Sequence, residues 1–133
     1  MKKTTFKGIE QGRAEFAFEC AEKGVKENAK YKSYVKKIPA MIQTNGLGAT
    51  LAFILSKSDE TTEEGKAYRL IYNKIKEWLL KSPIRDEIVI NEEDELVQHI
   101  ISLSSHQYRI ATMEVLAFFH WLRRFAEGLD QSN

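Results

Sequence analysis

Apolar residues recur along most of this chain with the spacing of about 3.6 residues that is typical of α-helices. Arg13 falls inside the apolar stripe of the first predicted helix, roughly Thr5 to Lys26. A guanidinium there must either pair with a buried acid or belong to an interface, and Glu10 is close enough in sequence to contribute. The pattern leaves both alternatives open. The stripe itself consists of Phe6, Ile9, Phe16, Ala17 and Cys20.

A second helix is predicted from about Tyr31 to Asn45. Pro39 lies inside it and should kink it, because proline cannot donate a backbone hydrogen bond to the carbonyl of Val35. Asn45-Gly46 then predicts a helix end, with the glycine in a left-handed conformation. The apolar face of this helix consists of Tyr31, Tyr34, Val35, Ile38, Met41 and Ile42.

Shorter elements alternate with longer ones in the rest of the chain. A short helix from about Gly48 to Lys57 precedes an acidic loop, residues 58–65. The next helix, about Glu63 to Lys81, ends at a Ser-Pro pair, because the residue before a proline disfavours helical geometry. Residues 82–92 form a linker, in which the triplet at 88–90 is interpreted as either a short extended piece or a packed loop.

The last predicted helix differs from the others in the distribution of its apolar residues. It follows a helix that begins near Asp94 and runs through Leu103, and Ser104 or Ser105 is its expected N-cap. From about His106 to Leu129, apolar residues cover most of its circumference, which is typical of a helix surrounded by others. The sequence therefore predicts an all-α, single-domain bundle of about five to six helices over residues 1–133, with a tail at 129–133.

Composition agrees with that architecture. The chain has 133 residues, of which 43% are hydrophobic, and only two prolines and seven glycines interrupt it. Cys20 is the single cysteine, so neither an internal disulfide nor a cysteine-built zinc site is possible within the chain, and a reducing compartment is favoured. No stretch of about 18 consecutive apolar residues predicts a membrane helix. We expect a soluble, cytoplasmic protein without membrane contact.

No motif points to catalysis. The three histidines belong to no HExxH or paired ExxH pattern, and Glu95 with His99 does not supply enough ligands for zinc, so solvated surface histidines are the interpretation. Cys20 lies on an apolar stripe, which favours an inert packed thiol. The Gly-Leu-Gly at 46–48 lacks the phosphate-loop pattern. We expect no enzyme activity, no metal and no cofactor.

Charge is segregated although the net charge is only +1. Acids concentrate at residues 59–64 and 86–95, whereas cations gather on two helices. Such basic surfaces can contact the phosphates of a nucleic acid without reading its bases. The alternative is that the cations are simply solvated or form ion pairs with residues such as Glu114. Base stacking on Tyr31, Tyr34 or Tyr68 is less favoured than core packing. The first basic surface consists of Lys30, Lys32, Lys36 and Lys37, and the second of Arg109, His120, Arg123 and Arg124.

Two stretches of this sequence resemble the small subunit of the Cmr complex, the type III-B CRISPR effector. Residues 31–53, YKSYVKKIPAMIQTNGLGATLAF, resemble its K-x-x-P-x-x-I-x-x-N-G-L block. Residues 108–128, YRIATMEVLAFFHWLRRFAEG, resemble its carboxy-terminal block, Y-R-x-A-T-x-E followed by W-L-R-R-F-A-E-G. The order and separation of the two blocks also fit, so the resemblance covers nearly the whole chain.

The resemblance implies a non-catalytic subunit of an RNA-guided complex that acts in antiviral defence. In that family, copies of the small subunit form a minor filament beside the backbone subunits and help to hold the guide–target RNA, while other subunits cleave. The implied partners are the other Cmr subunits, further copies of this chain, and RNA through its backbone. A helical adaptor for acidic protein surfaces is the main alternative, and a helical hydrolase is a third. The candidate RNA contacts are Lys32, from the charge pattern, and, by match to the motif, Lys36, Lys37, Arg109, Arg123 and Arg124.

Overall fold

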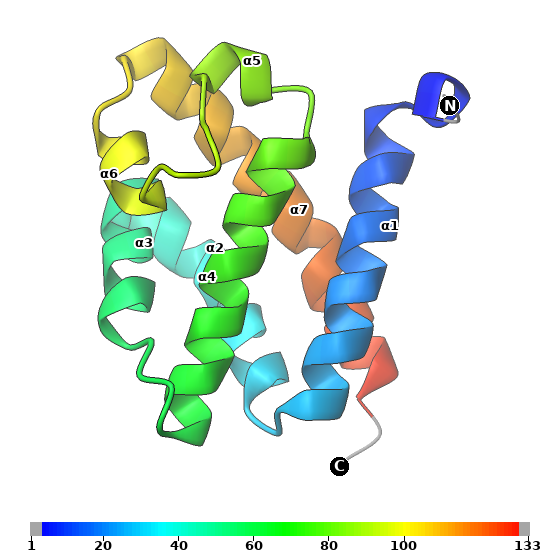
Figure 1. The fold of residues 1–133 in the computed structure, drawn as a ribbon. Helices are drawn as coiled ribbons and strands as arrows, with labels where there is room; N and C mark the ends of the chain where they lie inside the picture. The colour runs from blue at the N-terminus through cyan, green and yellow to red at the C-terminus, as the bar shows by residue number, and fades with distance from the viewer. Residues whose placement is uncertain (1–3, 131–133) are drawn as a thin grey trace.

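The computed structural model describes residues 4–130, with side chains from residue 8 onward, and contains no strand within that range. The all-α prediction is confirmed: residues 4–130 contain seven helices, of which α5 (Arg85–Ile88) and α6 (Leu96–Ile101) are shorter than seven residues. The side chain of Phe6, which the pattern assigns to the first apolar stripe, lies outside the described side chains, and the tail from 131 lies outside the described residues. The helices are α1 Thr4–Glu27, α2 Tyr31–Asn45, α3 Leu47–Ser56, α4 Glu63–Lys81, α5 Arg85–Ile88, α6 Leu96–Ile101 and α7 Ser105–Leu129 (Figure 1).

The first helix is interrupted near its start. Gly8 has φ 75° and ψ 179°, a conformation that only glycine adopts at low cost, so the chain turns sharply before the long part of α1 begins (Figure 1). The periodic pattern predicted an unbroken helix here, because Ile9 and the residues after it continue the apolar stripe on which that prediction depends.

A single glycine joins α2 to α3. α2 continues through Pro39 to Asn45, and the N–H of Gly46 donates to the carbonyl of Ile42. Gly46 has the positive φ that the sequence predicted, 92°, but its ψ of 159° lies outside the left-handed helical region. Because α3 begins at the next residue, Leu47, this glycine ends one helix and starts the other.

The predicted linker contains a helical turn of its own. α5 occupies Arg85–Ile88, and Val89 then takes the left-handed conformation, with φ 53°. Ile88 and Ile90 are buried on either side of the exposed Val89, so the triplet is a packed turn and not an extended piece. The predicted helix from Asp94 to Leu103 is shortened to Leu96–Ile101.

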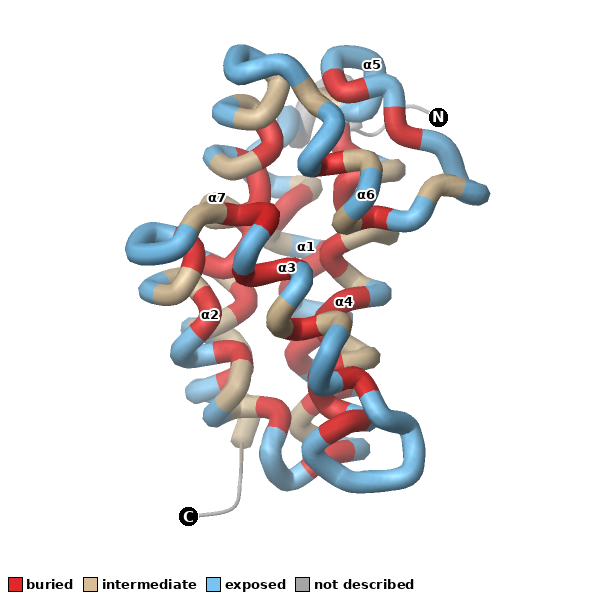
Figure 2. Tube along the Cα trace, turned by 90° about the vertical axis from the view of Figure 1, so that its left-hand side faces the viewer, coloured by how far each residue is buried: buried red, intermediate tan, exposed pale blue. Residues whose placement is uncertain are grey.

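α7 packs more extensively than any other described helix, as the interpretation of a central rod expected, but it is not surrounded, because one side, with Met113 and His120, is exposed. It packs against α1 most extensively, and also against α2, α4, α5 and α6. Ser104 is its N-cap and forms a capping box with Gln107. Figure 2 shows buried residues recurring along the inward sides of the helices.

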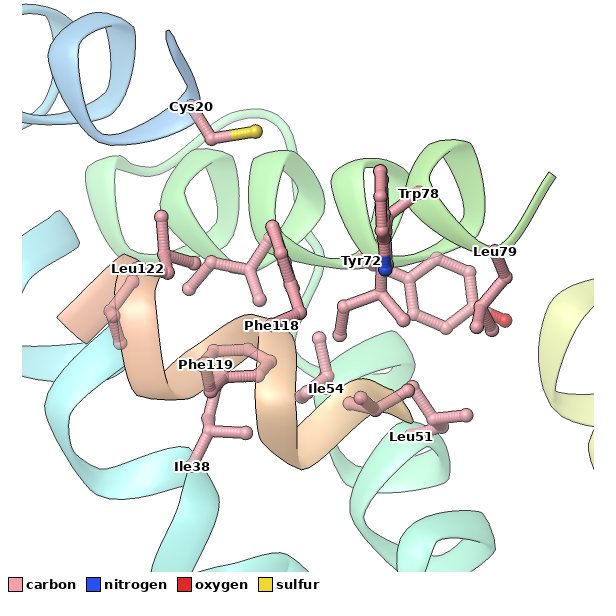
Figure 3. Close-up of a cluster of buried hydrophobic side chains, with 14 of the residues drawn as sticks. Cys20, Ile38, Leu51, Ile54, Tyr72, Trp78, Leu79, Phe118, Phe119 and Leu122 are labelled. Carbon is pink, nitrogen blue, oxygen red and sulfur yellow. The ribbon is translucent and has the colours of Figure 1, made fainter. Parts of the chain in front are cut away.

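Side chains of α7 and of four other helices meet in the part of the hydrophobic core that Figure 3 labels. Figure 3 shows Cys20 from α1, Ile38 from α2, Leu51 and Ile54 from α3, Tyr72, Trp78 and Leu79 from α4, and Phe118, Phe119 and Leu122 from α7. Phe16 joins them, with its ring stacked 5.4 Å from that of Trp78. None of the helices within residues 4–130 is long and apolar enough to cross a membrane.

Candidate nucleic-acid interface

The outward side of α7 carries exposed basic side chains, among them two arginines. Arg109, His120 and Arg124 are all exposed and lie on the same side of the helix, opposite the buried Phe118 and Leu122. Over fifteen residues this basic face extends about 22 Å. Met113 lies between the cations with 63% of its surface exposed. The structure therefore places three of the four basic α7 residues together on an open surface.

Arg123 lies at the border of that face. Its residue is half-buried, in contrast to the exposed Arg124 beside it. By helical geometry Arg123 points toward the side of α7 on which Phe119 packs, and Ile38 of α2 lies next to Phe119 in Figure 3. It therefore lies at the seam between α7 and α2.

The structure divides the lysines of α2 between two flanks. The ammonium of Lys32 lies 3.3 Å from Asp130 Oδ2, and that of Lys36 lies 3.8 Å from Glu127 Oε2, so both are beside the carboxyl-terminal end of α7. Lys37 lies on the other flank of the helix, beside Tyr68 of α4. Of the four lysines that the sequence grouped as one surface, Lys32 and Lys36 continue the basic face of α7, whereas Lys37 lies apart from it.

On its own flank, Lys37 accompanies a pair of stacked tyrosines. Its ammonium is 5.0 Å from the centroid of the Tyr34 ring and 5.8 Å from that of Tyr68. The two rings stack with centroids 4.3 Å apart and planes at 9°. Tyr31 and Tyr68 are fully buried, so core packing is their role, and only the half-buried Tyr34 reaches the surface. Desolvation, followed by the nearby charge of Glu64, raises the pKa of Tyr34.

Arg13 pairs with a buried acid. Its Nε donates to Glu114 Oε2 at 2.8 Å and its Nη2 to Glu114 Oε1 at 3.0 Å, while Nη1 donates to Glu10 Oε1 at 2.9 Å. Trp78 Nε1 donates to the same Glu114 carboxylate at 2.7 Å. The hydrogen bond to Glu114 is the main cause of the raised pKa of Arg13. Glu114 therefore faces inward and does not neutralise the basic face of α7.

The histidines differ from one another in environment. His106 and His120 are exposed, as the interpretation of solvated histidines expected. For His99 that interpretation is wrong: its side chain is 17% exposed, with Nε2 2.6 Å from the carbonyl oxygen of Ile88 and Nδ1 3.5 Å from Asp94. Its expected neighbour Glu95 instead accepts a hydrogen bond from the hydroxyl of Tyr72. His99 thus fastens α6 to the end of α5.

Cys20 and the acidic side chains that the structure describes form no set of metal ligands. Cys20 is buried, and desolvation raises the pKa of its thiol to about 12. Among the described side chains, no three or more His, Cys, Asp or Glu lie together as candidate metal ligands. The acidic turn before α6 is instead held by α4, because the ammonium of Lys76 donates to the backbone carbonyls of Glu92 and Asp94.

The arrangement of helices in this chain recurs in a solved protein structure. A crystal structure described as a CRISPR-associated Cmr5 family protein from Thermus thermophilus matches it with a TM-score of 0.70 and 25% sequence identity, over 92% of this chain and 96% of the other. The chain belongs to the Cas_Cmr5 family of CRISPR-associated proteins, which it matches over residues 9–129.

A protein from Thermus thermophilus, the organism of that crystal structure, also matches this chain at the sequence level. The CRISPR system Cmr subunit Cmr5 of Thermus thermophilus is 28% identical over 118 residues, which cover 87% of this chain and 90% of the relative. The resemblance to the small Cmr subunit, first based on residues 31–53 and 108–128, is confirmed.

Proposed function

We propose that this chain is the non-catalytic small subunit of a type III-B CRISPR (Cmr) effector complex and contacts the phosphate backbone of the guide–target RNA. Family membership supports the place in the complex. The observation that carries the RNA contact is the exposed basic face of α7, formed by Arg109, His120 and Arg124. In this proposal the chain acts in the cytoplasm, beside the backbone subunits and further copies of itself in a minor filament, while other subunits cleave RNA.

The chemistry of the face suits phosphate. A guanidinium offers a planar fork of donors that matches two phosphate oxygens, and such contacts hold a backbone in place without reading its bases. Arginines distributed over about 22 Å of one helix suit several successive phosphates better than one small anion. Arg123, at the seam with α2, adds a third arginine at the border of this face.

Lys32 and Lys36 of α2 extend the basic face of α7. Their ion pairs with Asp130 and Glu127 are partly exposed, with the lysine side chains 40% and 62% accessible. The Lys36–Glu127 pair is exposed on both sides and contributes only about 0–1 kcal/mol, so a phosphate can replace that carboxylate, whereas the Asp130 side chain is only 14% exposed. Lys37 lies on the opposite flank of α2. In this proposal it therefore contacts a different segment of the RNA backbone from the one that Lys32 and Lys36 contact.

The test reverses the charge of the two exposed arginines. Arg109→Glu with Arg124→Glu should weaken binding of a fluorescently labelled 30-nucleotide RNA, measured by anisotropy across a salt series. Because each phosphate contact to a single strand contributes about 0.7 to the slope of log affinity against log salt, the slope should fall by about 1.4. Arg85→Glu, an equally exposed arginine on α5, is the matched control and should leave the slope unchanged.

Folding of the variants is checked by circular dichroism. Neither arginine is buried, so the helical signal and the urea midpoint should stay at the wild-type values. An unchanged slope in a folded double variant would refute the assignment of RNA contact to this face.

One observation favours a second candidate function, that of a protein adaptor. Met113 is 63% exposed in the middle of the basic face, and exposed apolar residues between cations are typical of protein interfaces. An adaptor would stay assembled with its partners in 1 M salt after ribonuclease treatment, and Met113→Lys would release it. Retention of RNA by the Met113→Lys variant would separate the two functions.

A further inference from the structure

Tyr34 of α2 is the outermost ring of an aromatic stack that begins in the core. Its ring lies nearly parallel to that of Tyr68 in α4, with centroids 4.3 Å apart and planes at 9°. Phe53 of α3 packs against Tyr68 as well, with centroids 5.8 Å apart and planes at 88°. Tyr68 is 1% exposed and covers one face of Tyr34, which is itself half-buried. Tyr34 therefore presents to solvent its edge and its other face, which we call the outer face.

Lys37 stands beside this stack and does not cover the outer face of Tyr34. Its ammonium is 5.0 Å from the centroid of the Tyr34 ring and 5.8 Å from that of Tyr68. An ammonium above the outer face would be much farther from Tyr68 than from Tyr34, because the full thickness of the stack would separate it from the inner ring. The two similar distances instead place the ammonium at the common edge of the rings. The outer face is thus left to a further planar ring.

The charge around the outer face is positive. Lys30 lies one turn before Tyr34 and Lys37 about one turn after it, so helical geometry puts both lysines on the side of α2 that carries Tyr34. Both are exposed, and neither forms an ion pair with a described residue. Glu64 is the acid whose charge, after desolvation, helps to raise the pKa of Tyr34, whereas Lys37 lowers it. Two ammonium groups against one carboxylate leave a surface that attracts phosphate.

We propose that an unpaired nucleobase of the bound RNA stacks on the outer face of Tyr34, with the phosphate backbone of that nucleotide against the ammonium of Lys37. Every base has a π-face, so such stacking is strong without being specific for sequence. The stack on Tyr68 holds the Tyr34 ring in place before RNA arrives, which lowers the entropic cost of binding. A duplex offers no free base face unless a base is unstacked, so the site favours single-stranded RNA.

This site lies apart from the basic face of α7. Lys32 and Lys36 are beside the end of α7, whereas Lys37 and Tyr34 are on the flank of α2 that faces α4. A strand that contacts both surfaces must therefore cross α2. The α7 face holds phosphates, and the Tyr34 site adds a base contact at a second point along the same RNA.

The binding of RNA itself rests on the proposed function, and the test keeps the two apart. The isolated chain is titrated against two labelled probes, a 30-nucleotide oligouridylate and an RNA duplex of the same length, by fluorescence anisotropy. Tyr34→Leu removes the ring, and Tyr34→Phe retains it. Phe18→Leu is the matched control, because the Phe18 ring is 39% exposed on α1 and no described ammonium lies against it. Circular dichroism checks that each variant is folded.

We expect Tyr34→Leu to bind oligouridylate at least about fivefold more weakly than the wild type, and to bind the duplex equally well. Its salt slope should be unchanged, since no phosphate contact is lost, whereas Lys37→Gln should lower the slope by about 0.7. Tyr34→Phe should restore the binding that Tyr34→Leu loses, and Phe18→Leu should bind as the wild type does.

Two different failures have two different meanings. Wild-type affinity of a folded Tyr34→Leu chain for oligouridylate overturns the stacking proposal, and so does an equal loss for the duplex or in Phe18→Leu. The proposed function then still stands if Arg109→Glu with Arg124→Glu weakens binding. A wild-type chain that binds neither probe overturns the proposed RNA contact as a whole.

A crosslink tests the contact without any substitution in the protein. Oligouridylate that contains 5-iodouridine is bound to the wild-type chain and irradiated, which joins an iodinated base to an aromatic ring in contact with it. The crosslinked residue is identified by mass spectrometry. A crosslink at Tyr34 supports the proposal. Crosslinks confined to other residues, or none at all in a bound complex, overturn it.

Discussion

The buried ion pair between α1 and α7 makes a quantitative prediction about stability. In Glu114→Gln the side chain keeps its shape and its oxygen can still accept from Trp78, but Arg13 loses its buried charge partner. Both residues are nearly inaccessible, with exposed fractions of 8% for Arg13 and 5% for Glu114. Breaking such a pair typically costs about 3–5 kcal/mol, because one charge is left without compensation.

Glu10 reduces that cost. Its carboxylate still accepts one hydrogen bond from Arg13, so we expect the lower end of the range, about 3 kcal/mol. That is a large fraction of the total of about 5–15 kcal/mol by which a domain is stable. With a urea dependence of about 1.5 kcal/mol per molar, the unfolding midpoint should fall by about 2 M. Tryptophan fluorescence reports the transition, since Trp78 touches the pair.

A double-mutant cycle tests whether the pair is responsible. Arg13→Met alone and Glu114→Gln alone should each destabilise, but the two together should cost less than their sum by at least about 2 kcal/mol. The control is Glu77→Gln. It removes the ion pair that Glu77 forms with Lys74 at 2.9 Å, and the Glu77 side chain is 42% exposed. It should cost less than about 1 kcal/mol. Additive single substitutions, or a loss of less than about 1 kcal/mol in Glu114→Gln, would refute the reasoning.

Three further predictions concern single positions. A Cβ on Gly24 would lie 2.3 Å from the Tyr31 ring, so Gly24→Ala should lower the urea midpoint although alanine favours helices, and an unchanged midpoint would contradict the packing. The hydroxyl of Tyr31 is buried and has no hydrogen-bond partner among the described residues, so Tyr31→Phe should be neutral or stabilising in the same assay. Marked destabilisation would mean that the hydroxyl is bonded. With a thiol pKa of about 12, Cys20 should be about one part in ten thousand thiolate at pH 8. Iodoacetamide should therefore label Cys20 rapidly only after unfolding. Equally fast labelling of the native chain would place the thiol at the surface.

The helices were predictable because each buries a stripe against the same core. α2 has its predicted limits, and α4 ends at Lys81 where Ser82-Pro83 indicated, since local spacing and the stop signals determine both. α5 was not predicted, because a four-residue turn is too short to show a period. The break at Gly8 was also missed, since the periodicity of the sequence continues through it and only the backbone torsion shows the interruption.

The candidate site was predictable only within single helices. Helical arithmetic correctly placed Arg109, His120 and Arg124 on one side of α7. The same arithmetic separates Lys37 from Lys32 by about 140° around α2, but it could not show which of the two flanks lies beside α7. The partner of Arg13 is Glu114, 101 residues away, and the available signal was that Glu114 falls on the side of its helix opposite Arg109.

The pairing of α1 with α7 also determines the order in which the protein can fold during synthesis. α1 buries its apolar stripe, including Phe16 and Ala17, mainly against a helix that begins at Ser105. About 80 residues separate the two, and a ribosome adds about 5–20 residues per second, so α1 waits roughly 4–16 s for its partner. Throughout that interval the stripe is exposed to chaperones and to other nascent chains. Ribosome stalling before α7 therefore leaves the whole bundle unformed, not merely one helix short.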